Sequence, residues 1–125
     1  MAISATVKIK SSKATEVEDA IGYLPEVYMD FIRRYPDIGK AYANLANGCH
    51  KAGPLDKKIR RLIKLGIAIG INSEGSVPSH ARRALDEGIS PEEIRHVVLL
   101  AFTTVGFPLM VAAYKWVEEV LGKAK

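Results

Sequence analysis

The chain has 125 residues and a mass of 13.7 kDa, which is the size of one compact domain. Hydrophobic residues make up 48% and charged residues 26%, an ordinary globular usage that excludes a disordered or collagen-like chain. The single cysteine, Cys49, excludes an intramolecular disulfide. We therefore expect one folded domain over residues 1–125.

The net charge of +4 raises the question of nucleic-acid binding. The basic residues are spread along the chain, apart from one cluster between Lys57 and Lys64. On a helix this cluster forms the polar face opposite an apolar one, which is typical of a solvated amphipathic helix. No helix-turn-helix, zinc-finger or aromatic RNA-binding pattern accompanies the cluster. We therefore expect no nucleic-acid partner.

Two further patterns bear on location. The run from Val97 to Tyr114 has no charge, but Pro108 interrupts it, so two buried helices explain it better than a membrane span. The first five residues lack the basic start and long apolar stretch of a signal peptide. We expect a cytoplasmic protein without a membrane partner.

The hydrophobic spacing predicts an all-α domain of six helices with short links. Residues 2–10 alternate between apolar and polar and favour an extended arm or a short strand. Asp56 and Ser90 have the character of helix N-caps, with Glu93 closing a capping box, while Gly88 and Gly106 mark helix ends. The predicted helices cover residues 26–35, 37–50, 56–71, 77–87, 90–106 and 108–122.

Some apolar patterns predict burial. Residues 62–71 are apolar on nearly every face, which indicates a fully buried helix, and Cys49 lies on an apolar stripe as a buried, inert thiol. The last two helices are apolar on more faces than one small core absorbs, so we expect a homo-oligomer, with a well-buried core as the alternative. Their large side chains are Phe102, Phe107, Met110, Tyr114 and Trp116.

Motifs for phosphate, nucleophilic serine or zinc chemistry are missing from the sequence, and we expect neither a metal nor a cofactor. Glu93 and His96 have the Glu-x-x-His spacing of di-iron bundles, but the second copy that such a site requires is absent. These residues are therefore expected on a helix surface.

The segment from Ser73 to His80 is more informative. His80 shares a helix face with Val77, Ala81 and Ala84, and the turn before it offers backbone amides at a helix N-terminus, where anions bind. Lys64 or Arg61, on the preceding helix, can approach the same region. A buried imidazole beside basic groups suits acid/base work on a carboxylate substrate. The alternative is a core histidine with a structural hydrogen bond.

The order of these motifs resembles the carboxymuconolactone decarboxylase and alkylhydroperoxidase D superfamily over residues 55–121. The residues that carry the resemblance are Leu55-Asp56-Lys57-Lys58, Ser79-His80-Ala81-Arg82-Arg83-Ala84-Leu85-Asp86-Glu87-Gly88, Ser90-Pro91-Glu92-Glu93-Ile94 and Gly106-Phe107-Pro108. The resemblance implies an all-α helical bundle of the alkylhydroperoxidase D type that assembles into trimers or hexamers.

The peroxidase branch of that superfamily carries two cysteines and a glutamate that this chain lacks. Ser73 and Ser76 stand at the cysteine positions and Arg61 at the glutamate position, so that His80 alone remains. A serine hydroxyl forms neither a thiolate at neutral pH nor a disulfide. The dithiol peroxidase mechanism is therefore excluded on chemical grounds.

The decarboxylase branch does not depend on the cysteine pair. The resemblance therefore implies a lyase acting on a small carboxylated lactone or related acid, with His80 as proton donor. Arg61 or Arg82 would orient the carboxylate or stabilise the enolate, and Glu74 and Ser76 would position the substrate. The alternatives are a non-catalytic binding or structural oligomer and a residual peroxidase activity.

Overall fold

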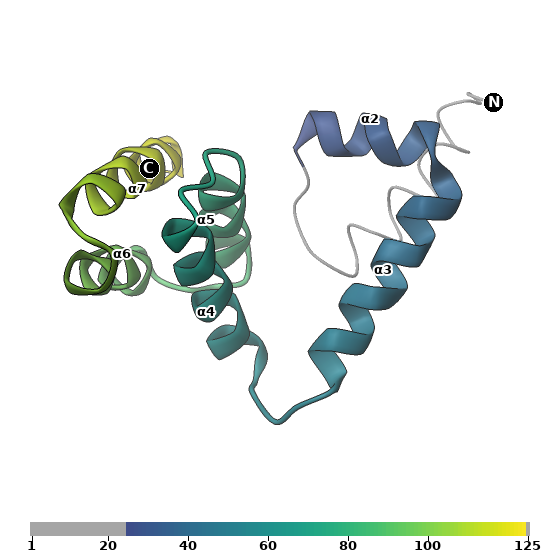
Figure 1. Cartoon of the computed structure of the whole chain (residues 1–125), viewed down its shortest axis with the longest axis horizontal. Helices are drawn as coiled ribbons and strands as arrows, with labels where there is room; N and C mark the ends of the chain where they lie inside the picture. Colours follow the sequence, from purple (N-terminus) through teal and green to yellow (C-terminus); the bar gives the residue numbers. More distant parts are fainter. Residues whose placement is uncertain (1–24, 125) are drawn as a thin grey trace. The chain divides into compact units, whose positions relative to one another are not determined.

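The computed structural model describes residues 25–124, which form six helices and no strand (Figure 1). The all-α prediction is therefore confirmed, whereas the expected arm at residues 2–10 lies outside the described residues. Contacts within the chain divide it into two compact units, residues 1–54 and residues 55–125.

The helices of the second unit begin where capping side chains were expected. The carboxylate of Asp56 accepts a hydrogen bond of 2.9 Å from the backbone N–H of Ile59 and caps α4 (Lys57–Gly70). At α6 (Pro91–Val105), the Ser90 hydroxyl accepts from the Glu93 N–H at 3.1 Å. The Glu93 carboxylate accepts in return from the Ser90 N–H at 3.0 Å. Both predicted N-termini are thus confirmed, capping box included.

Glycines with positive φ end two of these helices. Gly88, with a φ of 86°, follows α5 (Ser76–Asp86), and Gly106, with a φ of 96°, separates α6 from α7 (Phe107–Ala124). Residues with a Cβ rarely adopt a positive φ, so glycine is the residue that turns the chain here at low cost. The resulting links are short, and the two helices joined at Gly106, α6 and α7, pack directly against each other.

The four helices of the second unit pack in a ring. α5 packs against α4 and α7, and α6 packs against the same two helices, so that α5 and α6 lie across the bundle from each other. Small residues on α5 let its neighbours approach closely, since Ala81 and Ala84 are fully buried. The core consists of Leu65, Ala68, Ile69, Val77, Ala81, Ala84, Ile89, Ile94, Val98, Ala113, Val117 and Leu121.

The described part of the first unit is a helical hairpin of α2 (Glu26–Arg34) and α3 (Pro36–Lys51). Its core is small and consists of Ile32, Ala43 and Ala46, with Met29 packed against them. Cys49 is exposed on α3, so the prediction of a buried thiol is wrong. The hairpin buries only one narrow stripe of α3, and the neighbouring Leu45 is exposed as well.

The prediction that residues 62–71 are buried on all sides is also wrong for the single chain. Ile63, Ile67 and Ile71 are 45%, 59% and 70% exposed. Within the second unit α4 packs mainly against α5 and α6 and less extensively against α7, and the isoleucines on its remaining face point outward. The last two helices show the same excess, with Leu99, Leu100, Phe102, Phe107, Val111 and Tyr114 exposed.

Candidate active site

A buried arginine joins α4 to α5. The side chain of Arg61 is 7% exposed and forms a two-pronged ion pair with the carboxylate of Glu87, which follows directly after α5. Its Nε donates to Oε1 of Glu87 at 3.1 Å, and its Nη2 donates to Oε2 at 2.8 Å. Two parallel bonds of this kind fix the plane of a guanidinium as well as its position.

The same guanidinium contacts the histidine singled out in the sequence. Nη1 of Arg61 lies 2.9 Å from Nδ1 of His80. A guanidinium has no acceptor, so Nδ1 must accept this hydrogen bond. The proton of the neutral ring is then on Nε2. The contact between Arg61 and His80 therefore selects one tautomer of the imidazole.

The surroundings of His80 keep its ring neutral. Burial and the positive charges of Arg83, Arg61 and Lys64 lower its pKa from 6.5 to about 3. The cations come from α4 and from α5 itself. At neutral pH the ring is therefore uncharged, and the donor that it offers is its Nε2–H.

Helix periodicity explains how these residues meet. Arg61 lies one turn before the fully buried Leu65, on the face of α4 that packs against α5. On the other side, His80 and Glu87 are seven residues apart, two turns along one face of α5 and the residue after its end. Both partners therefore face Arg61, although they lie 19 and 26 residues away from it in the sequence.

The turn before α5 differs from the expected anion site. The backbone N–H of Ser76 donates to the Ser73 hydroxyl, the N–H of Val77 to the Ser73 carbonyl, and that of Ser79 to the Gly75 carbonyl. Residue 78 is a proline, which has no N–H. The first amides of α5 are thus bonded within the turn, and the charge near His80 comes from side chains instead.

The predicted site residues fall into two groups. The structure brings Arg61 to His80, and Ser76 lies one helical turn before His80, half-buried. Glu74 is exposed on the turn, and Arg82 is exposed on α5, where it faces Asp86 with 4.0 Å between Nε and Oδ1. Arg82 follows His80 by two residues, which places the two on different sides of the helix.

Two buried charges were missed by the sequence reasoning. Glu87 had no assigned role, and Arg83, 7% exposed, was not separated from its neighbour Arg82. A signal existed for both, because residues three and seven positions after a core-facing histidine share its side of a helix. An acidic residue in that register is the natural partner for a buried arginine on the neighbouring helix.

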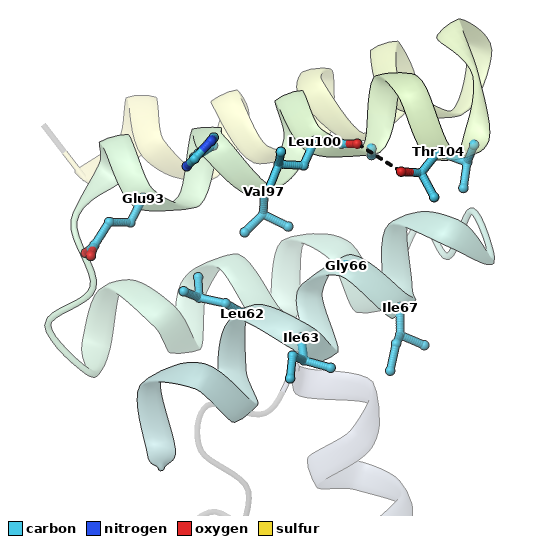
Figure 2. A pocket seen from close by; sticks show the side chains of 11 residues that line it. Leu62, Ile63, Gly66, Ile67, Glu93, Val97, Leu100 and Thr104 are labelled. Carbon is cyan, nitrogen blue, oxygen red and sulfur yellow. Dashed lines mark hydrogen bonds between the residues drawn. The ribbon is translucent and has the colours of Figure 1, made fainter. Parts of the chain in front are cut away.

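The described residues also form two apolar grooves on the second unit. The larger, about 610 Å³, lies between α4 and α6, with Val97 pointing across toward α4 and with Glu93 and Thr104 at opposite ends (Figure 2). The smaller, about 430 Å³, lies between α6 and α7. His80 lines neither of them, so the buried cluster and these grooves are separate features.

Residues 25–124 contain neither a group of metal-binding side chains nor a helix that could span a membrane. No three acidic, histidine or cysteine side chains in this range are grouped so that they could hold a metal ion. None of the helices described is both long enough and apolar enough to cross a lipid bilayer.

Comparison with known proteins places the chain in a family. The uncharacterized protein MJ1511 of Methanocaldococcus jannaschii is 25% identical over 101 residues, which cover 80% of this chain and 94% of that protein. The uncharacterized protein MJ0742 of the same organism is 30% identical over 88 residues, covering 70% and 85%. No solved structure is significantly similar to the chain. A model of the carboxymuconolactone decarboxylase family matches residues 36–119, from the start of α3 to well inside α7. The chain therefore belongs to the carboxymuconolactone decarboxylase family.

Proposed function

We propose that the protein is a carboxy-lyase that removes the carboxylate of a small carboxylated lactone or a related acid. Family membership supports this class of reaction. The observation that carries the proposal is the hydrogen bond from buried Arg61 to Nδ1 of His80, because it leaves a neutral imidazole with its proton on Nε2. His80 is the residue that meets the reacting atoms.

The chemistry makes use of this neutral ring. Loss of CO₂ breaks the bond between the substrate and its carboxylate carbon, and the electron pair stays on the substrate as an enolate. Nε2–H of His80 donates a hydrogen bond to the enolate oxygen, a role in which a neutral imidazole is effective. Transfer of that proton to carbon forms the product, the Arg61 N–H at Nδ1 stabilises the negative charge left on the ring, and a proton from water then restores Nε2–H.

The surrounding residues favour an anionic substrate. Lys64 and Arg83 act on His80 electrostatically together with Arg61, whose charge is offset by Glu87. All three cations lower the pKa of His80, so the potential at the ring is positive and favours a carboxylate there. Ser76 stays in the proposal as a substrate contact one turn from His80, and Glu74 and Arg82 stay as more exposed ones.

The test is the release of CO₂ from carboxymuconolactone. We expect His80→Gln to lower the rate by about 100-fold or more, the typical contribution of a positioned acid/base group. His96→Gln is the matched control, because His96 is exposed on α6 and does not line the cluster. Unchanged turnover in a correctly folded His80→Gln protein would remove His80 from the mechanism.

A structural role for the same cluster is the second candidate. The observation in its favour is that the guanidinium of Arg61 already forms three hydrogen bonds of 3.1 Å or less within the protein. In that case substitution of His80 lowers the thermal stability, and no lactone or related acid is turned over by the wild-type protein.

Peroxidase activity is the third candidate and is opposed by the residues present. The backbone N–H of Ser76 donates a hydrogen bond to the Ser73 hydroxyl, and neither serine supplies a thiolate. We expect no peroxide turnover by the wild-type protein. Turnover that persists after Cys49→Ala would contradict the exclusion of redox chemistry and point to another redox group.

We also propose that the chain assembles with itself, as a trimer or hexamer. The support is the apolar surface of the second unit, where large side chains on α4, α6 and α7 are exposed in the single chain. Exposed apolar patches of this extent mark interaction surfaces in soluble proteins. Sedimentation should give a mass of three chains or more, and a monodisperse monomer at micromolar concentration would contradict it.

A further inference from the structure

Glu87 and His80 contact the same guanidinium, that of Arg61. We infer that Glu87 is a positioning residue: its two bonds to Arg61 aim Nη1 of that guanidinium at Nδ1 of His80 and thereby keep the ring proton on Nε2. The inference deepens the proposed function, since it concerns the same site, but it rests on contacts that exist without a substrate.

The geometry leaves the guanidinium little freedom. The edge formed by Nε and Nη2 is occupied by the carboxylate of Glu87, at 3.1 and 2.8 Å. Because a guanidinium is planar, fixing this edge also fixes the direction of the Nη1–H bonds. Nη1 then lies 2.9 Å from Nδ1 of His80. The carboxylate thus sets the direction of a donor on the far side of the arginine.

Burial makes the carboxylate necessary. The side chains of Arg61 and Glu87 are 7% and 11% exposed, so water replaces neither partner well. A buried guanidinium without an anion is costly, and it leaves for solvent when its partner is lost. Without Glu87, Arg61 is therefore expected to turn away from His80, which would lose both its hydrogen-bond donor and one neighbouring positive charge.

The other charged groups around His80 stay in place in this scheme. Lys64 on α4 and Arg83 on α5 both act on the ring. On α7, which also packs against α5, Lys115 is engaged with Glu119 and is influenced by Glu74. A change at Glu87 therefore reaches His80 through Arg61, and the loss of that cation raises the pKa of the ring.

The experiment is nitrogen NMR of the histidine rings in the full chain, titrated from pH 8 to pH 2. His80 is assigned by comparison with His80→Gln. In the wild-type protein we expect one tautomer, protonated on Nε2, and no titration of His80 between pH 8 and pH 5. In Glu87→Gln, which loses the charge and one of the two acceptor oxygens, the pKa of His80 should rise by about one pH unit or more.

A second arginine–carboxylate pair in the bundle provides the matched control. Arg95 on α6 forms the same two-pronged arrangement with Glu118 on α7, at 2.8 and 3.0 Å. Glu118→Gln should leave the His80 signals unchanged. A His80 pKa that stays the same or falls in Glu87→Gln, or that rises equally in Glu118→Gln, would overturn the inference.

Two further variants keep the test decisive. The neutral pair Arg61→Met with Glu87→Leu shows how far the His80 signals move when the donor is gone and no charge is left unpaired. If Glu87→Gln does not fold, Glu87→Asp keeps the charge but is one methylene shorter, and should shift the His80 signals part of the way. None of these readouts requires turnover, so they can succeed even if the decarboxylase proposal fails.

Discussion

The two faces of α4 contrast sharply. Toward α5 the helix buries a charge, Arg61, together with Leu65 and Ile69. On the outer side it exposes a row of isoleucines one turn apart, Ile59, Ile63 and Ile67. A soluble helix normally shows the reverse arrangement, with charges outside and isoleucines inside. If the chain assembles with itself as proposed, both faces meet partners, one of them within the chain and the other on a second copy.

The charge on the buried face of α4 has hydrogen-bond partners within the chain, whereas the isoleucines on the outer face are exposed. Arg61 has a carboxylate and an imidazole at hydrogen-bond distance, which offset the cost of burying its charge. Ile63 and Ile67 line the groove between α4 and α6, where α6 contributes apolar side chains between the polar Glu93 and Thr104 at the two ends (Figure 2). A buried charge with its partners in place can serve the chemistry of a site. An exposed apolar row is favoured only if something covers it.

The largest effect is expected from leaving the buried charge without its partner. Glu87→Leu removes the carboxylate from Arg61 and should lower the free energy of unfolding by about 3–5 kcal/mol. The double variant Arg61→Met with Glu87→Leu should recover most of this loss, because two apolar side chains replace the ion pair. Urea unfolding measures both values.

The control for this prediction is the half-exposed pair of Arg95 and Glu118. Glu118→Leu should cost about 1 kcal/mol or less, since water screens this pair. Equal losses for Glu87→Leu and Glu118→Leu would mean that burial does not distinguish the two pairs, and the contrast between the faces of α4 would lose its basis.

The sequence predicts features that depend on residues close together in the chain, and it misses those that depend on residues far apart. The helix ends at Asp56, Ser90 and Gly88 depend on residues a few positions away, and the sequence predicts all of them. The placement of Arg61 depends on residues 19 and 26 positions further along the chain. Its helical register alone places it with solvated basic residues.

The same reasoning explains the errors in burial. A run of apolar residues predicts that a helix is covered on every side, but the number of neighbours is a property of the assembled bundle. Within the second unit α4 packs against α5, α6 and, less extensively, α7, and Ile63, Ile67 and Ile71 face outward. The residue pattern and the family resemblance both indicate His80 and Arg61, whereas the pairing of Glu87 with Arg61 joins two helices and was missed despite the register that Glu87 shares with His80.

The next effect concerns pH. His80 has a pKa of about 3 in the folded chain and 6.5 when it is unperturbed. Between these values the unfolded chain binds a proton that the folded chain does not bind. Stability therefore falls as the pH drops below 6.5, with a slope approaching about 1.4 kcal/mol per pH unit for one proton.

The carboxylate of Glu93 sets the lower end of the pH range in which this slope reports on His80. Hydrogen bonds from Lys58 and from Ser90 lower the pKa of Glu93 from 4.5 to about 2, so its contribution to stability is lost below pH 4.5. The window from pH 6.5 to pH 4.5 is therefore the informative one. His80→Gln should flatten the stability curve there, whereas His96→Gln should leave the slope in place. A slope retained in His80→Gln would contradict a neutral His80.

The smallest effect on the fold of one chain, and the clearest effect on assembly, is expected at the outer face of α4. Ile67 is 59% exposed, so Ile67→Lys should change the stability of the single chain by about 0.5 kcal/mol or less. Leu65→Ala on the buried face should instead cost about 2–5 kcal/mol.

If a second copy covers the isoleucines, a lysine among them places an unpaired charge in an apolar interface and separates the chains. The melting temperature of the wild-type protein should then rise with protein concentration, as it does for any folded oligomer, and that of Ile67→Lys should not. A wild-type melting temperature independent of concentration would mean that the outer face of α4 has no partner of its own kind.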